Sequence, residues 1–195
     1  KQKLISSKKK SFIVAVSGGP DSLALAALSK ALSFERKLKF YYVLIDHNIR
    51  KNSKKEANQV RSLLKKYKIN LKIISNKLII QKNIQSQARE IRYKFLSNFC
   101  KKKNTQTILT AHNLEDQVET FFIRLSRGSG LKGLSAMEHV SKLSSNIKLS
   151  RPLLNTKKID LMKISKLIFG FYFRDPSNKN QKYLRTRIRN LKKPL

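Results

Sequence analysis

Cysteine is nearly absent from this chain of 195 residues, and acidic side chains are scarce. The one cysteine, Cys100, excludes an intrachain disulfide framework and any metal or iron–sulfur site built from several cysteines of this chain. Cys100 falls in a helix-like run, where we expect a small buried hydrophobe and not a nucleophile. No run of about 18 apolar residues is present, so we expect a soluble protein without a membrane partner.

Positively charged residues dominate the composition of the chain. The chain has 44 lysine and arginine residues against 11 aspartate and glutamate residues, for a net charge of +33. Such a surface favours a polyanionic partner such as RNA. An AT-rich genome would also raise the lysine content without any need for binding. Arginine is harder to explain in that way, and the cluster of Arg185, Arg187 and Arg189 predicts phosphate contacts near the end of the chain.

Short apolar, β-branched runs alternate with runs of helical spacing along most of the chain. This order predicts right-handed βαβ crossovers, and therefore an α/β fold with a Rossmann-like parallel sheet covered by helices on both faces. A short helical, basic segment is expected at the C-terminal end. We expect strands at residues 11–16, 40–45, 71–74, 107–110 and 147–149. Helices are expected over the helical spacing of residues 23–32 and at 54–67, 84–101, 114–126 and 157–169.

The length allows one sizeable core with a short appended segment. We expect a catalytic domain over residues 1–145 and a C-terminal extension over residues 146–195, which packs on the same domain and contacts RNA. Ligands of parallel α/β sheets bind beyond the carboxyl ends of the strands. The loops that begin at Ser17, Asp46 and Ala111 directly follow strands and are rich in polar residues.

The sharpest local pattern is the glycine loop, residues 17–22, with the sequence SGGPDS between a strand and a helix. Two glycines let backbone amides approach an anion, and the helix N-terminus adds the positive end of its dipole. The pattern lacks the lysine of the Walker motif and the spacing of the dinucleotide-binding motif. We expect Asp21 either to cap the helix or to hold Mg²⁺. A capped tight turn without a ligand is the alternative.

Two other loops carry candidate functional side chains. Asp46 and His47 follow the second strand, although a lone histidine is more often structural. His112 precedes a helix on which Asp116 and Glu119 lie three residues apart. In so basic a chain, acids gathered at a strand end favour a cationic substrate or a metal, whereas ordinary acid placement in a first helical turn is the alternative. We expect the apolar residues of that helix to form its buried face: Leu114, Val118, Phe121, Phe122 and Leu125.

A basic helix face and a basic loop complete the candidates. Arg89 and Arg92 share one face of the expected helix at 84–101, as phosphate contacts would require. A salt-bridged surface involving Glu90 is the alternative. Arg127 opens a glycine-punctuated loop that extends to residue 133.

Together these segments resemble the PP-loop ATP pyrophosphatases and, within them, the tRNA(Ile)-lysidine synthetases. The glycine loop is similar to the SGGxDS signature, and residues 46–50 are similar to D-H-G-L-R, with Asn48 for Gly. Residues 112–134 resemble H-x-x-D-D-Q-x-E-T followed by R-G-x-G-L-x-G-L, with Glu115 for the first Asp. Residues 88–93 resemble A-R-x-x-R-Y, and residues 175–189 resemble D-P-S-N…Y-x-R-N-R-I-R, with Thr186 for Asn.

The resemblance implies an adenine nucleotide alpha-hydrolase-like fold with a PP-loop domain, and an ATP-dependent ligase. The family adenylates the wobble cytidine of the CAU-anticodon isoleucine tRNA at its C2 oxygen, and L-lysine then displaces AMP. Carried over by position, the ATP-binding residues would be Ser17, Gly18, Gly19, Pro20, Asp21, Ser22, Asp46 and His47, with Asp21 also holding Mg²⁺. The catalytic group would be Asp21, Arg92, His112, Asp116 and Glu119, the two last binding the ammonium groups of lysine. The tRNA contacts would be Arg89, Arg127, Arg185, Arg187 and Arg189.

Two rivals remain at this point. A tRNA thiolase of the same fold would need more cysteine, and a non-catalytic RNA-binding relative would be expected to have a damaged glycine loop. The expected location is the cytoplasm of a reduced AT-rich bacterium or an organelle interior, the plastid stroma before the mitochondrial matrix. A homodimer is compatible with the sequence.

Overall fold

A computed structural model of the chain describes residues 10–77, 84–130, 134–173 and 186–188. Strands and helices alternate through most of this length. The strands are β1 (Ser11–Val16), β2 (Lys39–Asp46), β3 (Leu71–Ser75), β4 (Thr107–Leu109), β5 (Val140–Ser144) and β6 (Ile147–Ser150). The helices are α1 (Pro20–Glu35), α2 (Ser53–Lys66), α3 (Ile84–Lys103), α4 (Leu114–Leu125) and α6 (Lys158–Phe169).

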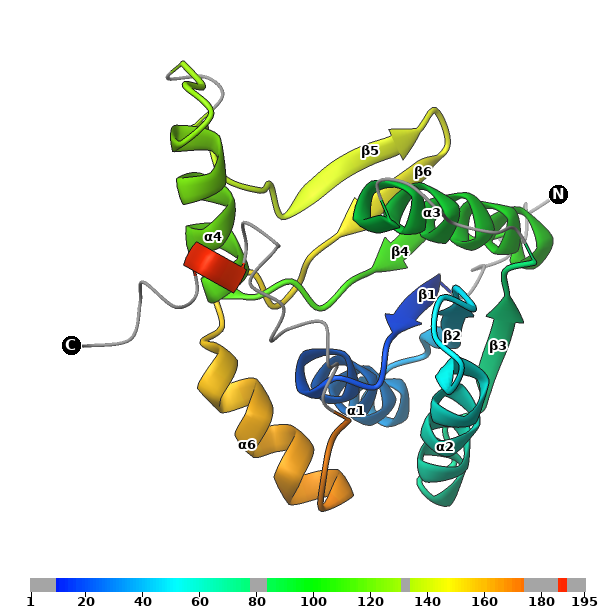
Figure 1. Ribbon diagram of the computed structural model, residues 1–195. Coiled ribbons are helices and arrows are strands. Elements are labelled where there is room, and N and C mark those ends of the chain that lie inside the picture. The colour runs from blue at the N-terminus through cyan, green and yellow to red at the C-terminus, as the bar shows by residue number, and fades with distance from the viewer. Residues whose placement is uncertain (1–9, 78–83, 131–133, 174–185, 189–195) are drawn as a thin grey trace, which may run out of the picture.

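The strands form one six-stranded sheet in the order β3-β2-β1-β4-β6-β5 (Figure 1). Every neighbouring pair is parallel except the β5–β6 hairpin. The chain first moves outward from β1 to β3 and then returns through α3 to place β4 against the other side of β1. The direction of winding therefore changes between β1 and β4, which is where sheets of this type bind ligands.

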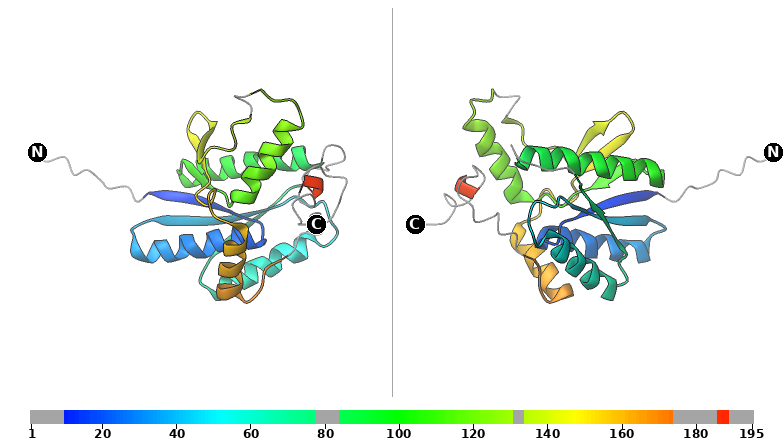
Figure 2. Two further views of the ribbon diagram at one scale, coloured as in Figure 1. Left: turned by 90° about the vertical axis from the view of Figure 1, so that its left-hand side faces the viewer. Right: turned by 45° about the vertical axis from the view of Figure 1, so that its right-hand side comes forward.

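Helices cover both faces of the sheet, and each covered face holds its own core (Figure 2). Helices α1, α2 and α6 lie on one face, where Leu23, Leu64 and Leu161 are fully buried together. Helix α3 lies on the opposite face, where Leu96 and Cys100 pack against strand residues. The strands can serve both cores because successive side chains of a strand point to opposite faces.

The predicted α/β fold and its expected strands and helices are confirmed, with ends that differ by a few residues. Burial of Cys100, which is 0% exposed, is confirmed as well. Strand β5 was not predicted. The expected domain boundary at residue 145 falls in the turn between β5 and β6, and β6 is hydrogen-bonded to β4 inside the sheet. Of the expected basic helical end, the structure describes residues 186–188, which are helical.

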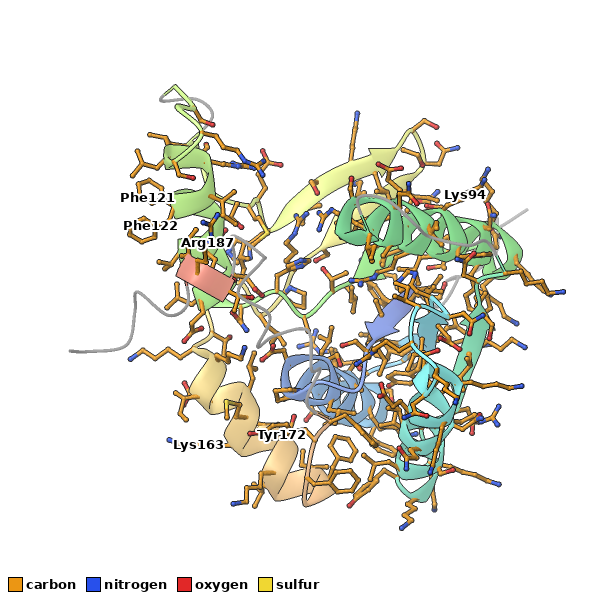
Figure 3. The ribbon with its side chains drawn as sticks, viewed as in Figure 1. Lys94, Phe121, Phe122, Lys163, Tyr172 and Arg187 are labelled. Carbon is orange, nitrogen blue, oxygen red and sulfur yellow. The ribbon has the colours of Figure 1, made fainter. Side chains whose placement is uncertain are left out.

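The predicted buried face of α4 is wrong. Val118, Phe121, Phe122 and Leu125 are 36–49% exposed, and the one fully buried side chain of the helix is that of Glu119. Helix α4 extends beyond the edge of the sheet, so most of its length has no strand surface beneath it, and the labelled rings of Phe121 and Phe122 point outward (Figures 1 and 3). Apolar periodicity alone could not reveal that the sheet ends beside this helix.

Candidate active site

The glycine loop is a tight turn held by the hydroxyl of Ser22. This hydroxyl accepts hydrogen bonds from the backbone N–H and the hydroxyl of Ser17, both at 3.1 Å, and donates to the carbonyl of Gly19 at 3.0 Å. Ser17 remains exposed at the end of β1. Gly19 occupies the N-cap position of α1 and has no side chain to cap it, with Pro20 at the first helical position. The first-turn amides of α1 are therefore left without a side-chain cap, as an anion site requires.

Gly18 is the residue of the loop that tolerates no replacement. Its φ of +85° is in the left-handed region, and a Cβ added there would lie 2.6 Å from Cγ2 of Val60 in α2. The carbonyl of Gly18 accepts a hydrogen bond from the backbone N–H of Phe173 at 3.1 Å. The loop is thus clamped between α2 and the segment that follows α6.

The buried carboxylate of Asp21 lies in the first turn of α1. Within the described part of the chain, its Oδ1 atom is buried and has no hydrogen-bond partner. The pKa of Asp21 is raised to about 6, chiefly by burial and also by the negative charges of Asp116 and Glu115. The positive charge of Lys158 and the side-chain amide of Asn113 act against this rise. A buried carboxylate oxygen without a partner is costly, so its environment fits a bound cation.

The start of α4 is fixed by a reciprocal capping box. The side chain of Asn113 accepts a hydrogen bond from the backbone N–H of Asp116 at 3.0 Å, and the carboxylate of Asp116 accepts one from the backbone N–H of Asn113 at 3.1 Å. Asp116 therefore has a structural role as a cap while its charge acts on Asp21. The carboxylate of Glu119, one turn further on, is only 2% exposed.

The N-termini of α4 and α6 are tied to each other, and the second half of α6 is tied to the start of α1. The carboxylate of Glu115 accepts a hydrogen bond from the backbone N–H of Lys158, the first residue of α6, at 2.8 Å. The backbone N–H of Leu114 donates to the carbonyl of Thr156 at 3.0 Å. The hydroxyl of Ser165 donates to the carbonyl of Pro20 at 2.5 Å. Lys158 at the start of α6, and Glu115 and Asp116 at the start of α4, all act on the pKa of Asp21 at the start of α1, so three helix starts lie close together at the glycine loop. We call this junction the helix-start cluster.

The second predicted loop places a neutral histidine after β2. Burial, and next the charge of Arg92 from α3, lower the pKa of His47 to about 4, while the charge of Asp46 acts in the opposite direction. Neither ring nitrogen of His47 has a hydrogen-bond partner among the described residues. Asp46 is 5% exposed and accepts a hydrogen bond from the backbone N–H of Asn48 at 2.9 Å. Asn48 has a φ of 53°, a conformation that asparagine tolerates better than most residues.

The other predicted residues lie in different surroundings. His112 is joined through Nδ1 to the hydroxyl of Thr110, 2.9 Å away, at the end of β4. The guanidinium of Arg89 lies 5.0 Å from the centre of the Tyr93 ring. Arg127 and Arg187 are exposed. Because α4 has 12 residues, Arg127 lies about 18 Å along the helix from its start. Arg185 and Arg189 fall outside the described residues.

Sequence reasoning missed two basic residues of this region. Lys158 is the described cation whose charge most lowers the pKa of Asp21. Its place at the first position of α6 was visible, but nothing local indicated that α6 would start beside α1. Arg151, at the end of β6, is 6% exposed and donates to the carbonyl of Glu138 and the hydroxyl of Ser141.

The sequence profile of the PP-loop domain matches residues 1–194, which is nearly the whole chain. The chain belongs to the PP-loop family. The glycine loop of residues 17–22 is accordingly its PP-loop, and membership in this ATP-utilising family implies use of ATP. Within the part that the structure describes, no helix has the length and apolar character needed to cross a membrane.

Several curated relatives share the PP-loop region with this chain. A tRNA(Ile)-lysidine synthase of Orientia tsutsugamushi (strain Boryong) is 41% identical over 185 residues, which cover 93% of this chain and 41% of the relative. One of Wolbachia pipientis wMel is 43% identical over 183 residues, covering 92% and 42%. One of Zymomonas mobilis subsp. mobilis is 35% identical over 184 residues, covering 92% and 55%. The chain therefore spans about two fifths to just over half of the length of these relatives.

The PP-loop fold also appears in a solved structure. The U34-tRNA thiolase NcsA from Methanococcus maripaludis, with its 4Fe-4S cluster, superposes with a TM-score of 0.77 over 97% of this chain and 67% of that one. The two sequences are 17% identical, so the likeness concerns the fold.

The raised pKa of Asp21 predicts a stabilising substitution. The folded protein holds the Asp21 proton more tightly than the unfolded chain, whose pKa is near 3.8, so ionisation costs folding free energy as the pH rises from about 4 to about 7. We expect Asp21→Asn to raise the free energy of unfolding by about 2 to 3 kcal/mol at pH 7.5 and by little at pH 4. Urea denaturation at both pH values measures this, with Glu35→Gln, at the exposed far end of α1, as the control. No gain at pH 7.5 would contradict it.

The clamp on Gly18 predicts a strong effect of one methyl group. In Gly18→Ala, an alanine must adopt the left-handed backbone conformation and its Cβ overlaps with Val60. We therefore expect the free energy of unfolding to fall by about 2 to 4 kcal/mol. Gly128→Ala is the matched control, because Gly128 has a φ of +67° but open space around it, and should cost about 1 kcal/mol. Equal losses in the two variants would show that the contact with α2 has no effect.

Proposed function

We propose that this chain carries the catalytic part of a tRNA(Ile)-lysidine synthetase, an ATP-dependent ligase that forms a carbon–nitrogen bond. The reaction joins L-lysine to C2 of the wobble cytidine in the CAU-anticodon isoleucine tRNA. ATP first adenylates the C2 oxygen and releases pyrophosphate, and the amine of lysine then displaces AMP. The modified tRNA reads AUA as isoleucine.

One observation supports the adenylation step above all others. The PP-loop presents an uncapped helix N-terminus beside a buried carboxylate oxygen that has no hydrogen-bond partner among the described residues. An anion with an attached cation satisfies both groups at once. ATP with Mg²⁺ has this chemistry. We assign ATP binding to residues 17–22 together with Asp46 and His47, whose ring is neutral at physiological pH.

We assign Asp21 as the protein ligand of Mg²⁺. Oδ1 of Asp21 fits the role, and no group of three or more His, Cys, Asp or Glu side chains among the described residues could hold a metal by itself. Magnesium commonly takes one or two carboxylates and completes its octahedral shell with phosphate oxygens and water. When bound, the ion would neutralise charge on the phosphates of ATP. Asp21 would orient it.

The acidic side chains of α4 suit a cationic second substrate. Asp116 and Glu119 lie one helical turn apart, and Asp116 is close enough to Asp21 to raise its pKa. Two nearby carboxylates in a chain with a net charge of +33 favour the ammonium groups of lysine. His112, at the end of β4 beside this helix, would lie near the reacting base. Catalysis would consist of positioning and charge stabilisation, without a covalent enzyme intermediate.

Arginines around the site suit the tRNA backbone. Arg92 lies close enough to His47 to lower its pKa and can approach the phosphates next to the reacting nucleotide. Arg89 from the same helix and Arg127 beyond α4 would bind further phosphates. The C-terminal residues Arg185, Arg187 and Arg189 complete the proposed tRNA contacts.

The thiolase alternative lacks a suitable nucleophile in this chain. Cys100 is fully buried in the core beneath α3, and burial raises the pKa of its thiol to about 11. A thiolate does not form readily under these conditions. A non-catalytic RNA-binding relative would have no use for the intact PP-loop. The oligomeric state and the compartment, a reduced AT-rich bacterium or a plastid stroma, stay predictions.

Lysine transfer is tested with the chain, ATP, Mg²⁺, labelled lysine and a CAU-anticodon isoleucine tRNA transcript. We expect the label to enter this RNA and AMP to be released, with no labelling when the wobble cytidine is replaced by uridine. Asp116→Asn should raise the Michaelis constant for lysine about tenfold or more, because it loses one charge partner of the ammonium group. Glu35→Gln, at the far end of α1, is the control.

The outcomes separate the two halves of the proposal. Release of AMP without labelling of the RNA contradicts the assignment of lysine as second substrate and leaves adenylation in place. Labelling of the uridine transcript as fast as of the cytidine transcript contradicts the assignment of the reacting base.

A further inference from the structure

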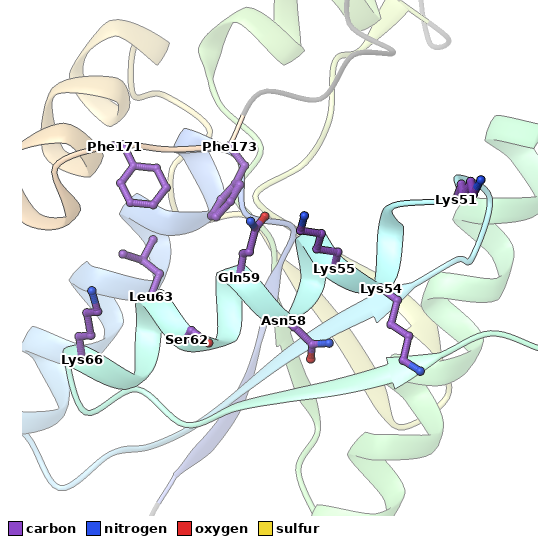
Figure 4. Close-up of a pocket in the computed structure, with 10 residues that line it drawn as sticks. All are labelled: Lys51, Lys54, Lys55, Asn58, Gln59, Ser62, Leu63, Lys66, Phe171 and Phe173. Atoms are coloured by element: carbon purple, nitrogen blue, oxygen red, sulfur yellow. The ribbon is translucent and has the colours of Figure 1, made fainter.

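A basic and aromatic groove runs along the outer face of α2. It is a pocket of about 750 Å³ between one side of this helix and the segment that follows α6 (Figure 4). Phe171 and Phe173 form one wall, and their side chains point toward α2. The opposite wall is formed by Lys51, Lys54, Lys55, Asn58, Gln59, Ser62, Leu63 and Lys66.

The charge of the groove has a single sign. Its lysines are exposed, and no acidic side chain lines it. The acidic residue of α2, Glu56, is engaged with Arg50 at 3.0 Å. Lysines that line one groove without a lining acid create a positive field, which favours a polyanion.

The aromatic wall of the groove indicates which class of polyanion can bind there. The rings of Phe171 and Phe173 meet edge to face with centroids 5.3 Å apart, and Phe171 is 50% exposed. An exposed ring such as that of Phe171, beside lysines, offers a flat surface on which an unpaired base can stack while phosphates contact the ammonium groups. A base-paired duplex hides its base faces, and an acidic peptide has none. The groove therefore fits a single-stranded RNA segment.

The position of the groove links it to the candidate active site. Helix α2 starts shortly after the loop of His47, so Lys51 and Lys54 lie at the end of the groove near the carboxyl edge of the sheet. Lys66 lies at the other end of the 14-residue helix, about 18 Å from Lys54. Phe173 is hydrogen-bonded to Gly18 of the PP-loop. A single-stranded RNA segment that leaves the candidate active site can follow α2 for a few nucleotides.

We propose that this groove binds unpaired nucleotides of the RNA substrate next to the reacting base. The proposal rests on the proposed function for the identity of the substrate, and on the groove itself for the chemistry of binding. The unpaired segment lies against Phe171 while its phosphates contact the lysines of α2.

Binding is measured by fluorescence anisotropy with a labelled octauridine RNA, in the absence of ATP and lysine. We expect Phe171→Ala to weaken binding about tenfold, since it removes a stacking surface. Phe34→Ala is the matched control, because Phe34 is 75% exposed, lies beside Lys30 on α1 and does not line this groove. It should change binding less than about twofold. A fully paired hairpin RNA should be insensitive to both substitutions.

The lysines are tested through the salt dependence of the same binding. Each phosphate contact on a single strand contributes about −0.7 to the slope of log K against log salt. We expect Lys54→Gln together with Lys55→Gln to make the slope shallower by about 1.4. The exposed pair Lys101 and Lys102 on α3, changed in the same way, should alter it by less than about 0.5.

Binding of octauridine by Phe171→Ala as tightly as by the unchanged chain overturns the proposal, as does equal competition by an oligoglutamate of matched charge. Both measurements are made without ATP and lysine, so they do not depend on catalytic activity. If the chain transfers no lysine but Phe171→Ala still loses RNA binding, the proposed function fails and the groove assignment stands. If lysine is transferred and Phe171→Ala binds normally, the groove assignment alone fails.

Discussion

The mutual anchoring of three helix starts is the constraint on which the rest of the site depends. Glu115 accepts a hydrogen bond from the backbone N–H of Lys158 at the start of α6, and Ser165, in the second half of α6, donates one to the carbonyl of Pro20 at the start of α1. The charges of Lys158, Glu115 and Asp116 all act on Asp21, which places the three helix starts near one another. These contacts hold the positive ends of several helix dipoles together, which is unfavourable unless negative charge is nearby. First-turn acids supply part of that charge: Asp21 in α1, Glu115 and Asp116 in α4, and Asp160 in α6. A triphosphate would supply more.

The helix-start cluster explains why a chain so poor in acids gathers them at one place. Asp21 is buried beside Asp116, so its pKa is raised to about 6, and Lys158 limits this rise. An arrangement of this kind stores electrostatic cost in the free protein and releases it when a cation binds. Glu115 has a different task. Its longer side chain, in the position where the family usually has aspartate, reaches the first amide of α6 and so belongs to the scaffold.

Much of the fold and part of the site could be predicted from the sequence, and particular residues show why the rest could not. Strand β1 and the PP-loop carry local signals, a β-branched run and two glycines, that do not depend on tertiary contacts. Strand β5 has no such signal, because Val140 is 53% exposed and its neighbours are mostly polar. Lys158 and the exposed face of α4 depend on where α6 and the sheet edge lie in space, which no local pattern encodes.

Calorimetric titration of the chain with ATP, in Mg²⁺ and again in EDTA, tests most directly whether the helix-start cluster is an ATP and cation site. We predict that the chain binds ATP at least about tenfold more tightly in Mg²⁺ than in EDTA. In the Asp21→Asn variant, this difference in affinity should disappear. Equal affinity in Mg²⁺ and EDTA, or a variant that keeps the full magnesium dependence, would contradict it.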